Sequence, residues 1–271
     1  MSPLSDDARW LIALDIDGTV LHEDGTLTDA TVEAVQRVAA AGHEVMLATG
    51  RSVSMTLPVL ERLGIVSQFV VCANGAIVLG RDADAPLGYA RVHVETFDPS
   101  EVLGTIRHHL ETASFAVEDA EGLFRYTGTF PDGALAAASE RVEFEELAHI
   151  AATRLVVISP DHQIDDFLAI VDRMGLHKVT YNVGWTAWLD IAPEGVNKAT
   201  GLEFVAGELG IPRSRVLAIG DGRNDIDMLE WVGVGVAMGQ APDEVLAVGD
   251  ETTGTDLEDG VAAVLARRFP A

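Results

Sequence analysis

Four short polar clusters place carboxylates, a lysine and a threonine next to apolar stretches of this sequence. They are centred on Asp15 and Asp17, on Thr49, on Lys198, and on Asp221 with Asn224 and Asp225. Carboxylates held close together attract a hard cation such as Mg²⁺, which prefers oxygen ligands and keeps places for water and a phosphate oxygen. An ammonium group and a hydroxyl beside that cation can hold an anionic phosphoryl group. The residue types therefore indicate magnesium-assisted chemistry on a phosphate, provided that the fold brings the clusters together.

The charge balance of the clusters supports the same reading. Four crowded carboxylates, those of Asp15, Asp17, Asp221 and Asp225, would repel one another, and some would take up protons. Lys198 supplies one positive charge and Mg²⁺ would supply two, so together they offset most of the negative charge. An anionic substrate becomes acceptable only where it faces these positive groups and the Thr49 hydroxyl.

Each cluster alone also has an ordinary structural explanation. An Asp-x-Asp pair is common in loops and helix caps. Thr49 and Gly50 could form a strand-to-helix turn, Asn224 and Asp225 could cap a helix, and Lys198 could lie on the surface. The four clusters occur together, each at the end of a strand or the start of a helix, and this conjunction favours a site.

The elements that must position these clusters alternate between apolar strands and amphipathic helices. We expect strands at 10–14, 44–48, 69–72, 216–219 and 234–237, and helices at 30–41, 53–63, 197–209, 226–231 and 257–269. This order predicts an α/β fold with a Rossmann-like parallel sheet core in three α/β/α layers. Ligands of such sheets bind beyond the carboxyl ends of the strands, so all four clusters should meet at one edge.

The middle of the chain has a different pattern. Expected strands at 90–94, 115–117, 124–126, 154–159, 179–183 and 187–191 are mixed with helices at 100–112 and 164–174. Strands at 179–183 and 187–191 are expected to pair. We therefore predict an inserted α+β domain at 82–189, between two core segments at 1–81 and 190–271.

Composition excludes several classes of function. The chain has 271 residues and a formal net charge of −25, which disfavours nucleic-acid and anionic-membrane partners. It has no long apolar run and no basic, apolar N-terminal signal, so we expect a cytoplasmic protein. The single cysteine, Cys72, lies in an apolar run and is expected to be buried. A monomer or a homodimer is expected.

The motifs of the core resemble those of the haloacid dehalogenase superfamily of phosphohydrolases. DIDGT at 15–19, ATGR at 48–51, GVNK at 195–198 and GDGRND at 220–225 look like its four motifs in order. The place of the insert resembles the Cof-like subgroup with a type-II cap that selects the substrate, and CANGA at 72–76 and GTDLEDGVAAVL at 254–265 look like that subgroup too. The resemblance covers about 10–79 and 189–269.

The resemblance implies roles for the carboxylates. Asp15 would be the nucleophile that forms an aspartyl-phosphate. Asp17 would be the general acid for the leaving oxygen and then the general base for water. Asp15, Asp221 and the backbone carbonyl of Asp17 would bind Mg²⁺, with Asp225 supporting the metal directly or through water.

The resemblance also implies a phosphate site. Thr49 and Lys198 would hold the phosphoryl oxygens, and Asn224 would orient Lys198 or the phosphate. Gly50 and Arg51 are expected in the same site. Asn74 would contact the substrate, or it would cap the turn at 74–76.

The inserted domain would face the leaving group of a small phosphorylated metabolite, with a sugar phosphate as the expected class. The candidate contacts are Asn182, Trp185, Trp188 and Arg125. Aromatic faces suit sugar rings and arginine suits a second anion. For the two tryptophans, packing of the insert or its hinge is the favoured alternative. His108 and His109 are expected on the surface.

Two other functions use similar residues. A phosphotransferase or phosphomutase would form the same aspartyl-phosphate and pass the phosphoryl group to another hydroxyl. A signalling receiver domain also combines Asp, Thr, Lys and Mg²⁺, but receivers are much shorter and phosphorylate an Asp on a later strand. Asp17 argues against a receiver, since an acid/base group beside the phosphorylated residue hastens hydrolysis.

The tripeptide Asp-Gly-Thr occurs twice, at 17–19 and at 24–26. Asp17 follows a carboxylate two positions earlier, and residues i and i+2 of a strand share a face, so Asp15 and Asp17 are expected to point at one site. His22 stands two positions before Asp24. The second copy is therefore predicted to form a β-hairpin turn without a catalytic role.

Overall fold

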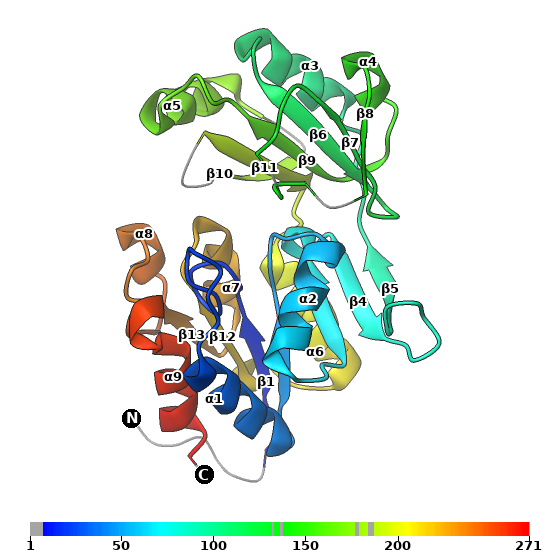
Figure 1. Cartoon of the computed structure of the whole chain (residues 1–271). Coiled ribbons are helices and arrows are strands. Elements are labelled where there is room, and N and C mark those ends of the chain that lie inside the picture. Colours follow the sequence, from blue (N-terminus) through cyan, green and yellow to red (C-terminus); the bar gives the residue numbers. More distant parts are fainter. Residues whose placement is uncertain (1–7, 132, 136–137, 177–178, 184–186, 271) are drawn as a thin grey trace. The chain divides into compact units, whose positions relative to one another are not determined.

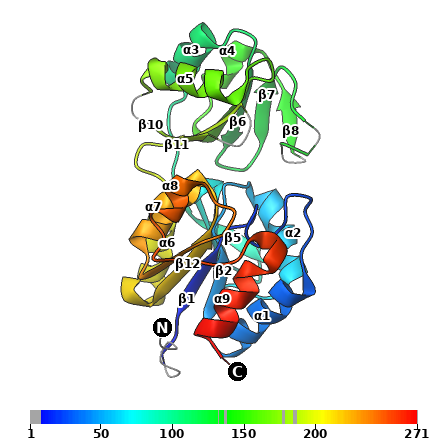
Figure 2. The same cartoon turned by 90° about the vertical axis from the view of Figure 1, so that its left-hand side faces the viewer.

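The computed structural model describes residues 8–131, 133–135, 138–176, 179–183 and 187–270, with the side chains of residues 182 and 183 left out. The chain divides into two compact units (Figures 1 and 2). One unit comprises Met1–Arg51, Met55–Val92 and Asn197–Ala271, and the other comprises Ser52–Ser54 and His93–Val196. The insert boundaries inferred from the sequence, 82 and 189, stay a prediction.

The first unit is built on a five-stranded sheet in the order β14-β13-β12-β1-β2. Its strands are β1 (Leu11–Leu14), β2 (Glu44–Leu47), β12 (Val216–Gly220), β13 (Val234–Ala237) and β14 (Glu251–Thr252). All four pairings are parallel, with Leu14 opposite both Leu47 and Ile219. Strand β1 is apolar and fully buried, as expected for the centre of a parallel sheet.

A second, three-stranded sheet of β3 (Phe69–Cys72), β4 (Ile77–Arg81) and β5 (Tyr89–Val94) continues beside β2. A parallel bridge between Ala48 and Val71 joins the two sheets. Cys72 is buried, as predicted. Strands β4 and β14 were not foreseen in the sequence.

Helices cover both faces of the parallel sheet. They are α1 (Asp29–Ala40), α2 (Val53–Leu63), α6 (Lys198–Leu209), α7 (Ile226–Trp231), α8 (Asp243–Leu246) and α9 (Gly260–Arg268), with short 3₁₀ turns η1 (Ala73–Gly75), η2 (Arg213–Arg215), η3 (Arg223–Asp225) and η4 (Asp256–Glu258). In Figures 1 and 2, α1 and α9 lie over one face, and α6 and α7 lie over the other. The predicted three-layer α/β/α core is therefore confirmed.

The second unit is an antiparallel sheet with helices on one face (Figure 1). Its strand order is β10-β11-β9-β6-β7-β8, and the pairing of β7 with β8 is parallel. The strands are β6 (Ser114–Asp119), β7 (Phe124–Thr127), β8 (Ser139–Arg141), β9 (Ala152–Ile158), β10 (Val179–Val183) and β11 (Trp188–Pro193), and the helices are α3 (Ser100–His109), α4 (Phe144–Leu147) and α5 (Ile164–Met174). The expected pairing of β10 with β11 is confirmed.

Two local predictions are wrong. The expected helix 257–269 is interrupted, because Asp259 has a left-handed backbone (φ +54°) that separates η4 from α9. The second Asp-Gly-Thr copy does form a turn, in which the His22 amide donates to the Thr26 carbonyl at 3.0 Å. The residues on either side of this turn do not form the paired strands of a β-hairpin.

Candidate active site

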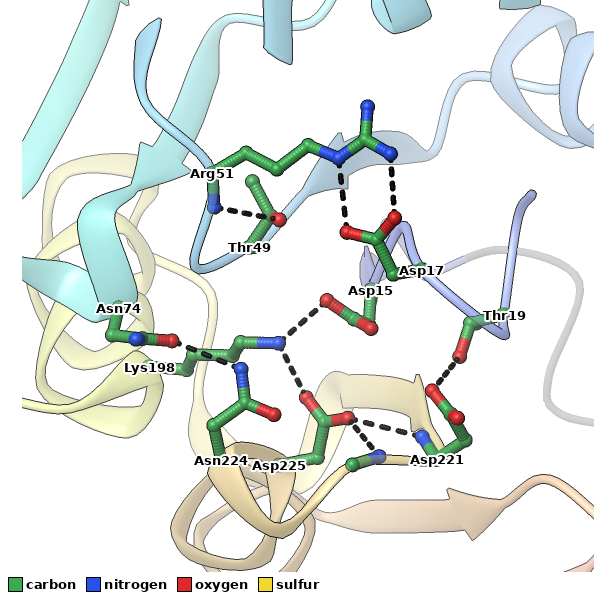
Figure 3. A network of polar contacts seen from close by, with 11 residues as sticks. Asp15, Asp17, Thr19, Thr49, Arg51, Asn74, Lys198, Asp221, Asn224 and Asp225 are labelled. Carbon is green, nitrogen blue, oxygen red and sulfur yellow. Dashed lines mark hydrogen bonds and ion pairs between the residues drawn. The ribbon is translucent and has the colours of Figure 1, made fainter. Parts of the chain in front are cut away.

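The ends of β1, β2 and β12 bring the predicted polar clusters to one edge of the parallel sheet (Figure 3). Asp15 follows β1 and Asp221 follows β12, and these two strands are neighbours. The Asp15 amide donates to the Ile219 carbonyl at 3.0 Å, which continues the ladder past the last strand residue. Two carboxylates 206 positions apart in the chain therefore face each other because their strands run parallel and in register.

Three of these carboxylates form a tight buried group. Asp15, Asp221 and Asp225 each offer an oxygen, and these three oxygens lie within 4.8 Å of one another. The ammonium of Lys198 donates to Asp15 Oδ1 at 2.6 Å and to Asp225 Oδ1 at 2.7 Å. Lys198 is fully buried, and it is the first residue of α6, whose N-cap is Asn197. The start of this helix thus fixes where the lysine enters the site.

Asp225 also holds the loop that follows β12. Its second oxygen, Oδ2, accepts hydrogen bonds from the amides of Asp221 and Gly222 at 3.0 and 2.9 Å. Gly220 is needed at the end of the strand, because a Cβ there would lie 2.4 Å from the Asp225 carboxyl carbon. One carboxylate therefore links Lys198 to the backbone that carries Asp221.

Burial changes the proton affinity of this group. Burial and the charge of Asp225 raise the pKa of Asp15 well above its usual range, although Lys198 acts against this shift. Burial and Asp225 also raise the pKa of Asp221 to about 7, against the hydrogen bond from Thr19. Burial would lower the pKa of Lys198, but the charges and hydrogen bonds of Asp15 and Asp225 outweigh it and raise that pKa.

The pKa values of Asp15 and Asp221 are raised first by burial and then by the charge of Asp225, and Lys198 offsets these effects only in part. The donors that converge here are carboxylate oxygens, the ligands that hard divalent cations prefer. A bound dication would favour the ionised form of each acid. Asp15, Asp221 and Asp225 therefore fit a divalent cation in both chemistry and charge.

Asp17 is placed differently from the prediction that it shares a face with Asp15. Arg51 Nε donates to Asp17 Oδ2 at 2.9 Å, and Arg51 Nη2 donates to Asp17 Oδ1 at 2.5 Å. The Asp17 side chain is 62% exposed and lies outside the group of three acids. The i, i+2 argument requires an extended strand, but β1 ends at Leu14 and a turn follows, with the Leu21 amide bonded to the Ile16 carbonyl.

Three of the predicted phosphate-binding residues, Thr49, Asn74 and Asn224, lie around the Lys198 side chain in Figure 3. Thr49 is fully buried, and its hydroxyl accepts a hydrogen bond from the Arg51 amide at 3.1 Å. Asn224 Nδ2 donates to Asn74 Oδ1 at 3.0 Å. Gly50 lies against Asn74, as a Cβ on Gly50 would be 3.0 Å from Asn74 Oδ1.

The structure adds two residues that the sequence reasoning missed. The Thr19 hydroxyl donates to Asp221 Oδ1 at 3.1 Å, so this threonine orients an acid of the group rather than only satisfying its own turn. Gln240 Nε2 donates to the Gly18 carbonyl at 2.5 Å, and its Oε1 accepts from the Asp256 amide. The DGT motif could have pointed to Thr19, whereas a single glutamine in a turn gives no sequence signal.

The candidates in the second unit take part in local contacts. Arg125 pairs with Asp119 at 3.0 Å and with Glu140 at 3.6 Å. Trp188 is half-buried and meets Phe130 edge to face. This contact agrees with the packing alternative given for Trp188 in the sequence analysis. Trp185 and the side chain of Asn182 lie outside the described residues. His108 and His109 are exposed, as predicted.

The chain matches the family of haloacid dehalogenase-like hydrolases over residues 12–265. This chain belongs to that family. The 5-amino-6-(5-phospho-D-ribitylamino)uracil phosphatase YitU of Bacillus subtilis is 27% identical over 270 residues, 96% of this chain and 97% of the relative. The pyridoxal phosphate phosphatase YbhA of Escherichia coli is 29% identical and covers 93% of this chain and 96% of its own.

The fold of this haloacid dehalogenase-like hydrolase is also found in solved structures. A family member from B. subtilis superimposes with a TM-score of 0.79 at 24% identity, over 94% of this chain and 98% of that one. The family and its named relatives identify the chain as an enzyme of the phosphatase type. Among the described residues, no helix has the length and apolarity to cross a membrane.

Proposed function

We propose that this protein is a Mg²⁺-dependent phosphohydrolase that removes phosphate from a small metabolite through an aspartyl-phosphate on Asp15. One observation carries the proposal. The carboxylate of Asp15 lies directly after β1, held by a buried lysine inside a group of three acids. Lys198 holds this oxygen nucleophile in place and opposes the rise in its pKa, and a bound Mg²⁺ would favour its ionised form while an anionic substrate approaches.

Asp15 and Asp221, supported by Asp225, would hold the Mg²⁺, together with the backbone carbonyl of Asp17. When bound, the cation would neutralise charge on the phosphoryl oxygens and act as a Lewis acid. Thr19 would keep Asp221 turned toward this position through its 3.1 Å hydrogen bond.

The covalent chemistry then falls to two carboxylates. One oxygen of Asp15 attacks the phosphorus atom, the bond from phosphorus to the ester oxygen breaks, and Asp17 gives a proton to the leaving alcohol. Water then attacks the phosphorus of the aspartyl-phosphate and loses a proton to Asp17. The bond between phosphorus and Asp15 breaks, and inorganic phosphate leaves.

Asp17 must exchange one partner for another during this cycle. Its carboxylate is paired with Arg51 here, and the pair is open to solvent on the Asp17 side. An arriving phosphate dianion competes for the guanidinium, because Arg binds phosphate and carboxylate with the same fork of donors. We propose that Arg51 turns to the phosphoryl group and leaves Asp17 to the leaving oxygen.

The remaining phosphate contacts would come from Lys198, the Thr49 hydroxyl, the Gly50 amide and Asn224. Lys198 and Thr49 are fully buried, so their positions are fixed before substrate binds. A preformed set of donors stabilises the charge of the transition state without reorganisation.

We propose a sugar phosphate or polyol phosphate as the substrate. The two named relatives act, by their names, on a phosphate of a ribityl chain and on pyridoxal phosphate, which are both small phosphorylated metabolites. The substrate would be the main partner. The absence of nucleic-acid and membrane partners, a cytoplasmic location, and a monomeric or homodimeric state stay predictions.

A panel of phosphorylated metabolites tests the proposal. Purified protein with Mg²⁺ should release inorganic phosphate from at least one sugar or polyol phosphate, ranked by kcat/KM, and chelation of the metal should stop it. Phosphate isomers interconverted with little free phosphate would instead indicate a phosphomutase. A phosphoprotein that persists after treatment with acetyl phosphate would indicate a receiver-like switch.

A further inference from the structure

The 3₁₀ turn η1, residues 73–75, has an unusual backbone. Ala73 and Asn74 both have left-handed conformations, with φ of +48° and +52°, and Gly75 follows with φ of +101°. Left-handed non-glycine residues are uncommon, and asparagine tolerates the conformation better than alanine does. Two in succession persist only where the surroundings fix them, and such positions concentrate at functional sites.

The backbone of this turn holds the loop that carries Thr49. The Ala73 amide donates to the Arg51 carbonyl at 2.9 Å, and the Asn74 amide donates to the Thr49 carbonyl at 3.0 Å. Both amides of this left-handed pair therefore donate to the same loop. The positions of residues 49–51 therefore depend on the conformation of residues 73 and 74.

The side chain of Asn74 lies between two other parts of the site (Figure 3). Its Oδ1 accepts from Asn224 Nδ2 at 3.0 Å, and it is 3% exposed. On the other side it fills the space next to Gly50, where a Cβ would lie 3.0 to 3.4 Å from the Asn74 amide atoms. Asn74 thus connects the loop after β2 with the loop after β12.

The third residue of the turn meets the start of α6. A Cβ on Gly75 would lie 2.1 Å from the Asn197 carbonyl oxygen, so the backbone of the turn packs directly on the residue before Lys198. Three loops that carry Thr49, Lys198 and Asn224 consequently contact the same three residues.

We propose that the 73–75 turn sets the mutual positions of Thr49, Lys198 and Asn224, and that Asn74 is a positioning residue that acts through Asn224. The inference rests on the proposed function, in which these three residues bind the phosphoryl group. It assigns Asn74 an indirect role instead of the substrate contact considered from the sequence.

A double-mutant cycle tests this role. Asn74→Gly keeps the left-handed backbone and removes the amide, and Asn224→Ala removes its partner. We expect Asn74→Gly to lower kcat by about 10- to 100-fold with little change in KM, since small misplacements of oriented groups have effects of this size. The double variant should be no slower than Asn224→Ala alone, because both changes remove the same link. Multiplicative losses, or an unchanged kcat in Asn74→Gly, would overturn the inference.

Gly50→Ala is a second test of the contact between Gly50 and the Asn74 side chain. The added methyl group should displace the Asn74 amide and lower kcat, whereas adding Gly50→Ala to Asn74→Gly should cause no further loss, since the space is then free. Asp259→Gly is the matched control. Asp259 is also left-handed, and its carboxylate accepts a hydrogen bond from the Thr28 hydroxyl at 2.6 Å. Loss of this bond should lower Tm and leave kcat and KM unchanged.

Hydrogen exchange separates failure of this inference from failure of the proposed function. If the wild-type protein releases no phosphate from any substrate, the proposed function is wrong. Hydrogen exchange then tests whether Asn74 positions the two loops. Asn74→Gly should speed amide exchange in both 47–52 and 221–226, and unchanged exchange in both segments would overturn the inference. If the wild-type protein is active but the losses of kcat in Asn74→Gly and Asn224→Ala multiply in the double variant, the inference alone is wrong.

Discussion

Arg51 holds the carboxylate of Asp17 in a fork of two hydrogen bonds, at 2.9 and 2.5 Å, just outside the buried acids of the site. This geometry adds direction to the attraction of opposite charges, and lysine could not reproduce it. In the proposed mechanism, this pair orients the acid/base group Asp17 until a phosphate dianion competes for Arg51.

The two Asp-Gly-Thr copies provide a matched test of Asp17. Asp17→Asn removes the proton donor and acceptor and should lower kcat by at least about 100-fold, the usual contribution of general acid–base catalysis. Asp24→Asn should leave kcat within about twofold, since Asn suits the same turn and can still accept from the Thr26 amide. Steady-state phosphate release measures both, and equal losses would contradict the division of roles.

The two glycines of the same copies give a second matched pair. Gly18 and Gly25 have nearly equal φ, +73° and +79°, so alanine at either should cost about 1–2 kcal/mol of stability. A Cβ on Gly18 would also lie 2.3 Å from Asp221 Oδ2, whereas a Cβ on Gly25 would meet nothing within 4 Å. We expect Gly18→Ala to lose Mg²⁺-dependent activity and Gly25→Ala to keep it. Loss of activity in both would show that the strain, not the contact, matters.

Lys198 is expected to stabilise the fold as well as bind phosphate. Lys198→Met leaves Asp15 and Asp225 buried without their cation and should lower the free energy of unfolding by about 3–5 kcal/mol in denaturant titrations. Adding Asp225→Asn should recover part of this stability by removing one unpaired charge, without restoring turnover. A Lys198→Met variant as stable as the wild-type protein would contradict the ion-pair account.

The acid group predicts a link between pH and metal binding. Its raised pKa values, about 7 for Asp221 against about 3.9 in an unfolded chain, mean that the folded state binds protons more tightly than the unfolded state. The stability that these acids contribute is present below about pH 4 and is lost as the pH rises through about 7. Mg²⁺ binds the ionised acids and should offset that loss.

The rise in Tm on adding Mg²⁺ should therefore be larger at pH 8 than at pH 5, where protons compete for the same oxygens. Scanning calorimetry at both pH values measures this, with Asp221→Asn as the control that should reduce the Mg²⁺ effect. An equal rise in Tm at both pH values would mean that the cation binds elsewhere.

The parallel core could be predicted because its signals are local. The apolar stretches before Asp15, Thr49 and Asp221 are short and bounded by turn residues, and parallel strands bring their carboxyl ends to one edge. The prediction that these clusters converge follows from topology alone and does not depend on side-chain conformations.

The rest depended on backbone detail that periodicity does not encode. The pairing of Asp17 with Arg51 requires a turn directly after Leu14, and the break before α9 requires a left-handed Asp259 inside an apolar helical pattern. Strand β4 follows the 73–75 turn, in which Ala73, Asn74 and Gly75 all have positive φ. Such choices are set by contacts between distant segments.

Trapping of the phosphoryl group on Asp15 tests the central claim most directly, because loss of activity in Asp15→Asn would also follow if Asp15 only held the metal. In Asp17→Asn, 4-nitrophenyl phosphate needs no acid for its leaving group, while hydrolysis of the intermediate lacks its base. We predict a burst of 4-nitrophenolate stoichiometric with enzyme, and one phosphoryl group on the peptide that contains Asp15 after acid quench. Release of 4-nitrophenolate without a burst, and with no phosphoryl group on Asp15, would contradict the account.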